Sequence, residues 1–140
     1  MTDEDEIPPR WQTRASIEKL SVMFSLRTDP YMQDWDIEAA DPGIVDKLVD
    51  AYSDPSLTED DRFALMCLIL GSLNAAKHEG RDISVWWSRV AKILTENTQV
   101  HAYTMAYWAC GEDPDPDHQF LITPEIRNMR REAKPGLTIP

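Results

Sequence analysis

The part of the sequence that most resembles a metal-binding loop is the acidic segment EDPDPDH. Asp113, Asp115 and Asp117 alternate as the first ligands of a calcium-binding EF-hand loop do. The sixth position of such a loop should be glycine but is His118, and the twelfth should be glutamate but is Pro124. We therefore interpret this segment as a solvated acidic loop, and we expect neither a metal ion nor a cofactor.

The three histidines, His78, His101 and His118, are spread along the chain and form no HExxH zinc motif. A GxSxG nucleophile motif and a glycine-rich phosphate-binding loop are also missing from the sequence. We therefore predict no catalytic residue and a non-enzymatic protein. In the enzyme alternative, His101 works with nearby carboxylates. That alternative requires a concave pocket holding His101 and a carboxylate within hydrogen-bond reach.

Acidic side chains outnumber basic ones by 25 to 14, and the formal charge is −11. This charge repels nucleic-acid phosphates and anionic membranes, so we expect neither as a partner, and it favours a basic protein partner. The longest unbroken apolar run is Phe63–Leu70, far shorter than the roughly 20 residues that cross a bilayer. The acidic start MTDEDEIPPR is unlike a secretory signal, and we expect a cytoplasmic location.

The acidic excess is concentrated in residues 29–61, where eleven acidic side chains accompany one basic side chain, Lys47. Five of these acids have no evident capping role and are interleaved with aromatic residues, a composition typical of surfaces that dock a basic partner. We predict a partner-binding face of Tyr31, Asp34, Trp35, Asp36, Glu38, Asp46 and Asp50, with Trp87 as a further anchor. The alternative is a face that only keeps the protein soluble.

Apolar spacing and capping residues predict helices along most of the chain. The strongest signal covers residues 59–78 after the cap Thr58, where apolar residues fall on nearly every side, as in a helix at the centre of a bundle. Further helices are predicted at about 14–27, 42–53, 83–96, 99–110 and from residue 123 onward. In the 99–110 helix we place the apolar side at Val100, Tyr103 and Tyr107.

No strand pair or hairpin turn is evident in the sequence. We therefore predict an all-α fold, a compact array of about six helices around the central apolar helix at residues 59–78. We expect a disordered acidic tail at residues 1–10, a single helical domain at 11–134 and a flexible C-terminal tail at 135–140.

Three segments, DWDIEAADP, DDRFALMCLIL and HAYTMAYWA, resemble those of small helical bacterial proteins of the toxin-immunity type, which are encoded beside polymorphic toxins. The likeness extends over about residues 33–130. It implies a binding protein that masks a basic toxin or effector domain, and it assigns no catalytic residue to this chain.

Our leading hypothesis is a protein-binding module of the immunity or antitoxin type, which captures a basic partner through an acidic surface and blocks it sterically. The second hypothesis is a helical scaffold or regulatory subunit that forms a homodimer through an apolar face. The oligomeric state and the identity of the partner stay open at this stage. The small enzyme built around His101 is the third hypothesis.

Overall fold

The described residues of the computed structural model, 7–26, 28, 34–111 and 113–138, form seven α-helices and no strand. The predicted all-α fold is therefore confirmed. The helices are α1 (Arg14–Met23), α2 (Trp35–Glu38), α3 (Val45–Ala51), α4 (Glu59–His78), α5 (Ser84–Glu96), α6 (Thr98–Ala109) and α7 (Thr123–Thr138). Two 3-10 turns, η2 (Pro42–Ile44) and η3 (Pro116–His118), precede α3 and α7.

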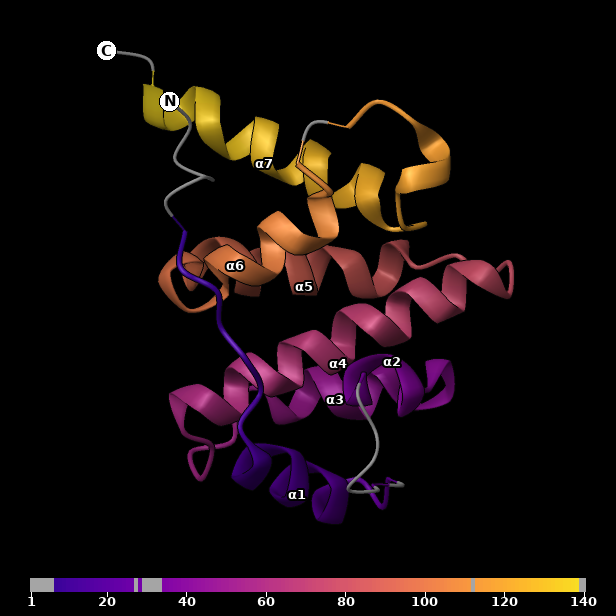
Figure 1. Cartoon of the computed structure of the whole chain (residues 1–140), viewed down its shortest axis with the longest axis vertical. Helices are drawn as coiled ribbons and strands as arrows, with labels where there is room; N and C mark the ends of the chain where they lie inside the picture. Colours follow the sequence, from indigo (N-terminus) through magenta and orange to yellow (C-terminus); the bar gives the residue numbers. More distant parts are fainter. Residues whose placement is uncertain (1–6, 27, 29–33, 112, 139–140) are drawn as a thin grey trace.

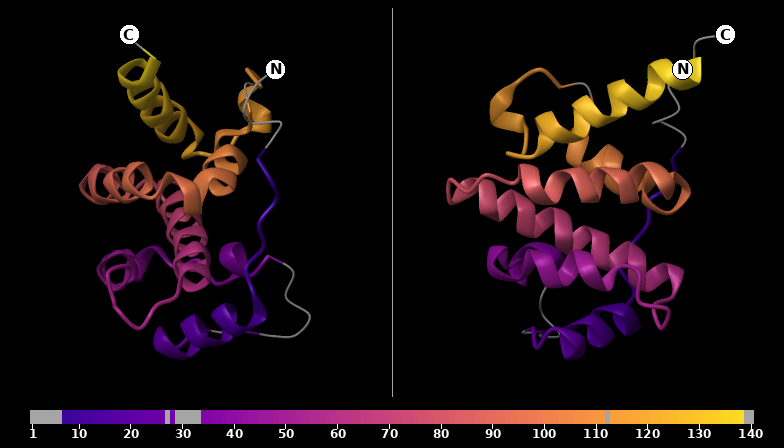
Figure 2. Two further views of the ribbon diagram at one scale, coloured as in Figure 1. Left: turned by 90° about the vertical axis from the view of Figure 1, so that its left-hand side faces the viewer. Right: turned by 180° about the vertical axis from the view of Figure 1, so that it is seen from behind.

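Helix α4 lies at the centre of the molecule, as predicted for residues 59–78. All residues from Phe63 to Leu73 are buried, so α4 has no solvent-facing side over that stretch. It contacts α1, α2, α3 and α6. The views show α4 crossing the middle of the molecule, with α1 at one end of the long axis and α7 at the other (Figures 1 and 2). Burying one leucine-sized side chain contributes about 2 kcal/mol. Helix α4 supplies more of the buried apolar side chains than any other described helix, so it makes the largest apolar contribution to stability.

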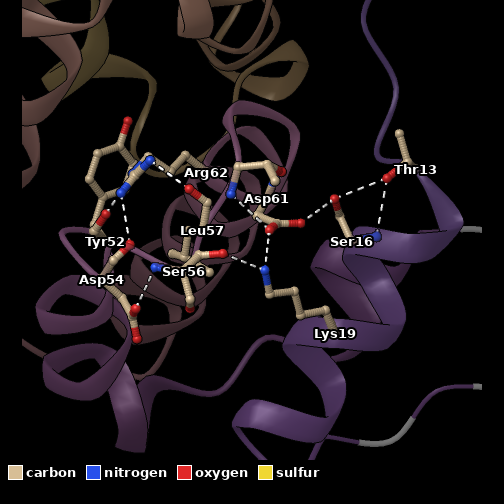
Figure 3. Close-up of polar contacts among 10 residues, drawn as sticks. Thr13, Ser16, Lys19, Tyr52, Asp54, Ser56, Leu57, Asp61 and Arg62 are labelled. Carbon is tan, nitrogen blue, oxygen red and sulfur yellow. Dashed lines mark hydrogen bonds and ion pairs between the residues drawn. The ribbon is translucent and has the colours of Figure 1, made fainter.

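A buried carboxylate fixes the start of α4 against α1, as Figure 3 shows. Thr58 and Asp61 form a reciprocal capping box, in which the Asp61 carboxylate accepts the Thr58 amide at 2.9 Å. The same carboxylate accepts hydrogen bonds from Ser16 Oγ and Lys19 Nζ of α1, each at 2.7 Å. Burial alone would raise the pKa of Asp61, but hydrogen bonds from Lys19, Thr58 and Ser16 outweigh it and lower the pKa to about 2.

The next residue, Arg62, ties the end of α3 to the first turn of α4 (Figure 3). Its guanidinium donates to the backbone carbonyls of Tyr52, Asp54 and Leu57 at 2.8–2.9 Å. Carbonyls at a helix C-terminus have no partner within the helix, and here a charged side chain supplies donors to that turn. The connection between α3 and α4 is therefore held by side-chain hydrogen bonds from the central helix.

Capping side chains also precede α3 and α5. Asp41 accepts the Gly43 amide at 2.8 Å before α3, and Asp82 accepts the Ser84 amide at 2.9 Å before α5. Helix α6 ends where Cys110 and Gly111 take left-handed conformations. Residues 121–122 form a turn that leads into α7.

Helix α1 is shorter than predicted. It starts after the cap Thr13, whose hydroxyl accepts the Ser16 amide, but it ends at Met23 rather than near residue 27. Ser25 has a φ of 54°, a left-handed conformation that no continuing helix adopts. The predicted end near residue 27 is therefore too late, and residue 27 itself lies outside the described ones.

The buried face of α6 differs from the predicted one. His101, Thr104, Met105 and Trp108 are buried, whereas Val100 and Tyr103 are half-buried and Tyr107 is exposed. The buried set has the spacing i, i+3, i+4, i+7 of a single helix face. Apolar residues of α6 occur on several sides of the helix, so its composition does not determine which side is buried. Its packing against α4 and α7 does.

An extended arm, residues 7–13, runs past α6 and α4 to the start of α1 (Figure 1). Arg10 fastens it, donating to Glu59 at 3.1 Å and to Asp60 at 2.9 Å while its guanidinium lies 4.9 Å from the centre of the Phe63 ring. Residues 1–6 of the predicted acidic tail lie outside the described residues, but Arg10, which we assigned to that tail, is held on α4.

The C-terminal boundary also differs from the prediction. Helix α7 continues to Thr138, past residue 134, where we expected the helical domain to end. The predicted tail at 135–140 therefore begins as helical backbone, and residues 139–140 lie outside the described part of the chain.

We expect Asp61→Asn to destabilise the protein by about 2 kcal/mol at pH 7, because it weakens the hydrogen bonds that join α1 to α4. The folded-state pKa of Asp61 lies below the unfolded value, so its contribution is present above pH 3.8 and is lost as pH falls towards 2. Urea unfolding followed by circular dichroism at pH 7 and pH 2.5 measures both effects. The control is Glu18→Gln, which removes an exposed pair with Arg14 and should change stability by less than about 0.5 kcal/mol. Equal stabilities of the two variants at pH 7 would contradict this role.

Candidate functional site

A cavity of about 150 Å³ lies between the arm, α2, α4 and α6. We call it the aromatic recess, because five aromatic side chains line it. Its lining residues are Arg10, Trp11, Gln12, Asp34, Asp36, Phe63, Cys67, Tyr103, Thr104, Tyr107 and Trp108. Four separate stretches of the chain therefore build it, and the left view of Figure 2 shows the arm, α2 and α6 on the same side of α4.

The inner part of the aromatic recess consists of buried side chains from α4 and α6. Phe63 and Cys67 are four residues apart on α4, and Thr104 and Trp108 are four apart on α6, so each pair shares a helix face. Cys67 Sγ lies 3.8 Å from Thr104 Oγ1. Burial raises the pKa of the Cys67 thiol to about 11, which keeps it protonated and unreactive at neutral pH.

Aromatic rings surround the opening of the aromatic recess. Trp11 is 74% exposed and meets Tyr103 edge to face, with ring centres 6.3 Å apart. Tyr107 is 45% exposed, and its ring stacks on Phe120 with centres 5.4 Å apart. Large exposed aromatic residues in one place are uncommon on a soluble domain and are characteristic of binding surfaces.

Two carboxylates, Asp34 and Asp36, contribute the negative charge of the aromatic recess. Asp36 is half-buried, and burial followed by the charge of Asp34 raises its pKa. Burial, then the charges of Asp36 and Asp34, also raises the pKa of Tyr107. Within the described residues, no basic side chain forms an ion pair with either carboxylate. The aromatic recess thus holds partly desolvated negative charge that, among the described residues, no basic side chain pairs with.

Arg10 also lines the aromatic recess, but its charge is already matched. It pairs with Glu59 and Asp60 and lies over Phe63. Burial opposes these acids, yet they raise the pKa of Arg10 overall. Its positive charge is therefore directed to the start of α4 rather than to Asp36.

Gly71 on α4 allows α2 to bring Asp36 to the aromatic recess. A Cβ atom at position 71 would lie 2.5 Å from the backbone carbonyl oxygen of Asp36, closer than any real contact of this kind. Only a residue without a side chain permits this approach of the two backbones. Trp35 anchors the same turn, since it is buried and its indole Nε1 donates to Ser21 Oγ at 3.2 Å.

This position corrects the prediction that Trp35 is a surface anchor. Trp35 is only 2% exposed, because the one-turn helix α2 directs it into the core. Its neighbours Asp34 and Glu38 are exposed as predicted, and Glu38 accepts a hydrogen bond from the Asp34 amide at 3.3 Å. Tyr31 lies outside the described residues.

The predicted acidic face is divided between two sides of α4. Asp46 and Asp50 lie on α3, which packs against α5, while Asp34 and Asp36 lie beside α6 in the aromatic recess (Figure 2). Asp46 accepts a hydrogen bond from Trp86 Nε1, and Asp50 pairs with Arg89 at 2.7 Å. The five acids therefore do not form one continuous surface, and the predicted single face is wrong.

Trp87 also lies away from the aromatic recess. It is half-buried and lines a separate groove between α5 and α7, together with Ala91 and Met129. Part of its ring packs against the core. A partner that contacts Asp36 in the aromatic recess would not be held by Trp87 as part of the same site.

The surroundings of His101 differ from those that the enzyme alternative requires. His101 is 0% exposed, and its Nε2 lies 2.6 Å from the Tyr52 hydroxyl rather than from a carboxylate. Burial, with a smaller effect of the Arg10 charge, lowers its pKa to about 4. Its Nδ1 has no hydrogen-bond partner in the described part of the chain. The described residues therefore do not place His101 in a concave pocket beside a carboxylate, as the enzyme alternative requires.

The loop around η3 is held by its own side chains. Asp113 accepts the Asp115 amide at 2.9 Å and lies 2.8 Å from His118 Nδ1. Asp115 in turn accepts the Asp117 amide at 2.9 Å. Residue 112 is not among the described residues, and in the described part of the chain no three acidic, histidine or cysteine side chains are grouped as metal ligands would be.

No protein family, curated protein or solved structure matches this chain significantly. Among the helices in the described residues, none combines the length and the hydropathy needed to cross a bilayer.

Several residues of the aromatic recess were not identified from the sequence as one site. Trp11 and Gln12 belong to an arm whose path depends on Arg10, and no periodic pattern reveals such a path. Tyr103 and Tyr107 fall on one side of the predicted 99–110 helix, a spacing that core packing explains equally well. Gly71, the only glycine within α4, gave a usable signal, since a glycine inside a helix commonly marks a close approach of another backbone.

We expect Gly71→Ala to displace α2 and open the aromatic recess, because the added methyl group collides with the Asp36 carbonyl. The cost should be about 1–3 kcal/mol. In a Cys110→Ser background, a thiol reagent should label Cys67 faster in this variant, since Cys67 lines the aromatic recess that the displacement of Asp36 would widen. Gly80→Ala is the matched control: it strains a left-handed residue far from the aromatic recess and should leave the labelling rate unchanged. Equal rates in the two variants would show that α2 has not moved.

The buried His101 should make the protein less stable in mild acid. The unfolded chain binds a proton near pH 6.5 and the folded chain only near pH 4, so stability falls by about 3 kcal/mol as pH drops across this window. The double variant Tyr52→Phe with His101→Leu should lose this part of the pH dependence. Tyr52→Phe alone should retain it, which makes it the control. Denaturant unfolding at pH 7 and pH 4.5 tests the difference, and parallel pH profiles for the two variants would refute it.

Proposed function

We propose that this protein is a binding module that captures a basic segment of a protein partner in the aromatic recess. The observation that carries the proposal is the half-buried Asp36 carboxylate, which has no basic partner among the described residues although it lies beside Asp34 in a ring of aromatic side chains. A cation that entered the aromatic recess would stabilise the ionised form of both carboxylates.

The aromatic side chains support a cationic ligand independently of the carboxylates. The faces of tryptophan and tyrosine rings attract cations, by about 0.5–2 kcal/mol according to how far the pair is shielded from water. Trp11, Tyr103 and Tyr107 provide such rings at the opening. The methylene groups of a lysine or arginine can lie on these rings while the charged end reaches Asp36.

The net charge of −11 adds long-range attraction for a basic partner. Such attraction increases the association rate and is weakened by salt. We further propose that the partner is a basic toxin or effector domain and that the module inhibits it by covering its surface, as the resemblance to toxin-immunity proteins implies. That resemblance and the acidic composition support this more specific proposal.

We expect a twelve-residue peptide of alternating lysine, arginine and glycine to bind the protein and to bind about tenfold more weakly at 500 mM than at 50 mM NaCl. Asp36→Asn should weaken binding at least about tenfold, because it removes a half-buried charge. Asp50→Asn removes an equal formal charge that already pairs with Arg89, and it should change affinity less than about twofold. Isothermal titration calorimetry measures the affinity of the peptide at the two salt concentrations and for the two variants.

Affinity should also fall as pH drops through the raised pKa of Asp36, because the protonated acid no longer attracts a cation. Circular dichroism establishes that each variant is folded before titration. If Asp36→Asn and Asp50→Asn weaken binding equally, net charge rather than the aromatic recess accounts for binding and the proposal fails.

A further inference from the structure

We infer that the aromatic recess takes the side chain of a single arginine of the partner, with its guanidinium on Asp36 and its methylene groups against Trp11 and Tyr103. This inference rests on the proposed function and specifies its ligand. It predicts selectivity for arginine over lysine, which attraction between net charges does not provide.

The size of the aromatic recess limits the ligand to one side chain. Its volume of about 150 Å³ is below the roughly 300–1,000 Å³ of sites that hold cofactors or drug-sized molecules. The exposed rings of Trp11 and Tyr107 lie at the opening, whereas Phe63 and Trp108 are buried. A long, narrow side chain with an apolar stem and a charged end fits this arrangement.

The chemistry of the lining favours a guanidinium over an ammonium. A guanidinium is planar, is more weakly hydrated than an ammonium, stacks on aromatic rings and donates two parallel hydrogen bonds to a carboxylate. The half-buried Asp36 benefits from a cation that loses little hydration on entry. Asp34, the second acid of the aromatic recess, offers a further acceptor for the remaining N–H groups.

Arg10 shows the same mode of binding within the chain. Its guanidinium lies 4.9 Å from the centre of the Phe63 ring and donates to two carboxylates, Glu59 and Asp60, at 3.1 and 2.9 Å. Asp34, Asp36 and the rings at the opening of the aromatic recess offer the same combination of an aromatic face and two neighbouring acids, and no basic side chain of the described residues pairs with these two acids. Arg10 itself lines the aromatic recess, so the two arrangements are adjacent.

The test uses three blocked tripeptides, acetyl-Gly-X-Gly-amide, in which X is arginine, lysine or citrulline. Citrulline matches arginine in shape but carries no charge. Titration into the isotopically labelled full-length protein, followed by amide chemical shifts, gives affinity and location. We expect the arginine peptide to bind at least fivefold more tightly than the lysine peptide, to shift the amides of Asp36, Tyr103 and Tyr107, and to lose binding when citrulline replaces arginine.

Two variants localise the effect. Trp11→Ala removes an exposed ring and should weaken binding of the arginine peptide severalfold without unfolding the protein. Trp87→Ala, at the other groove, is its control and should have no effect on this peptide.

Equal affinities for the arginine and lysine peptides would overturn the arginine selectivity and leave the proposed function standing. Absence of binding by either tripeptide, together with salt-sensitive binding of the longer basic peptide that Asp36→Asn weakens, would likewise reject the single-side-chain inference alone. Shifts around Asp50 instead of Asp36 would reject both.

Discussion

The complete burial of α4 is the constraint on which the other elements depend. A helix that is apolar on nearly every side has to be covered on every side, and a chain of 140 residues has few elements with which to do so. Helices α1, α2, α3 and α6 each cover part of it, and the arm crosses it where Arg10 meets Phe63. Asp61 belongs to the same arrangement, because it fixes the depth at which α1 meets the first turn of α4.

The aromatic recess forms between the elements that pack on α4. Elements that approach α4 from different directions do not close completely over the stretch between Phe63 and Cys67, and the remaining space is lined by their side chains. Its charge comes from α2, which reaches α4 only because position 71 is glycine. A carboxylate is thereby held near an apolar interior, where water solvates it poorly and the electrostatic interactions of its charge are strong.

The helical part of the fold follows closely from local sequence. The limits of α4, the caps at Thr58, Asp41 and Asp82, and the stop after α6 all rest on side chains that act within a few residues. Contacts between residues that are far apart in the sequence cannot be predicted from such local signals. The arm depends on an ion pair across 49 residues, and α2 is too short for a periodic pattern.

The candidate site was predictable only in part for the same reason. The local sequence identifies Asp34 and Asp36 as acids of an aromatic-containing segment, yet nothing in their neighbourhood of the sequence shows that α4 separates them from Asp46 and Asp50. Trp11 reaches the site on a segment fixed on both flanks, by Arg10 on one side and by the Thr13 cap of α1 on the other. Its backbone has therefore already lost most of its conformational entropy in the free protein, so a ligand that docks against the indole has little loop ordering to impose, and differences in affinity among ligands should be expressed in dissociation rates.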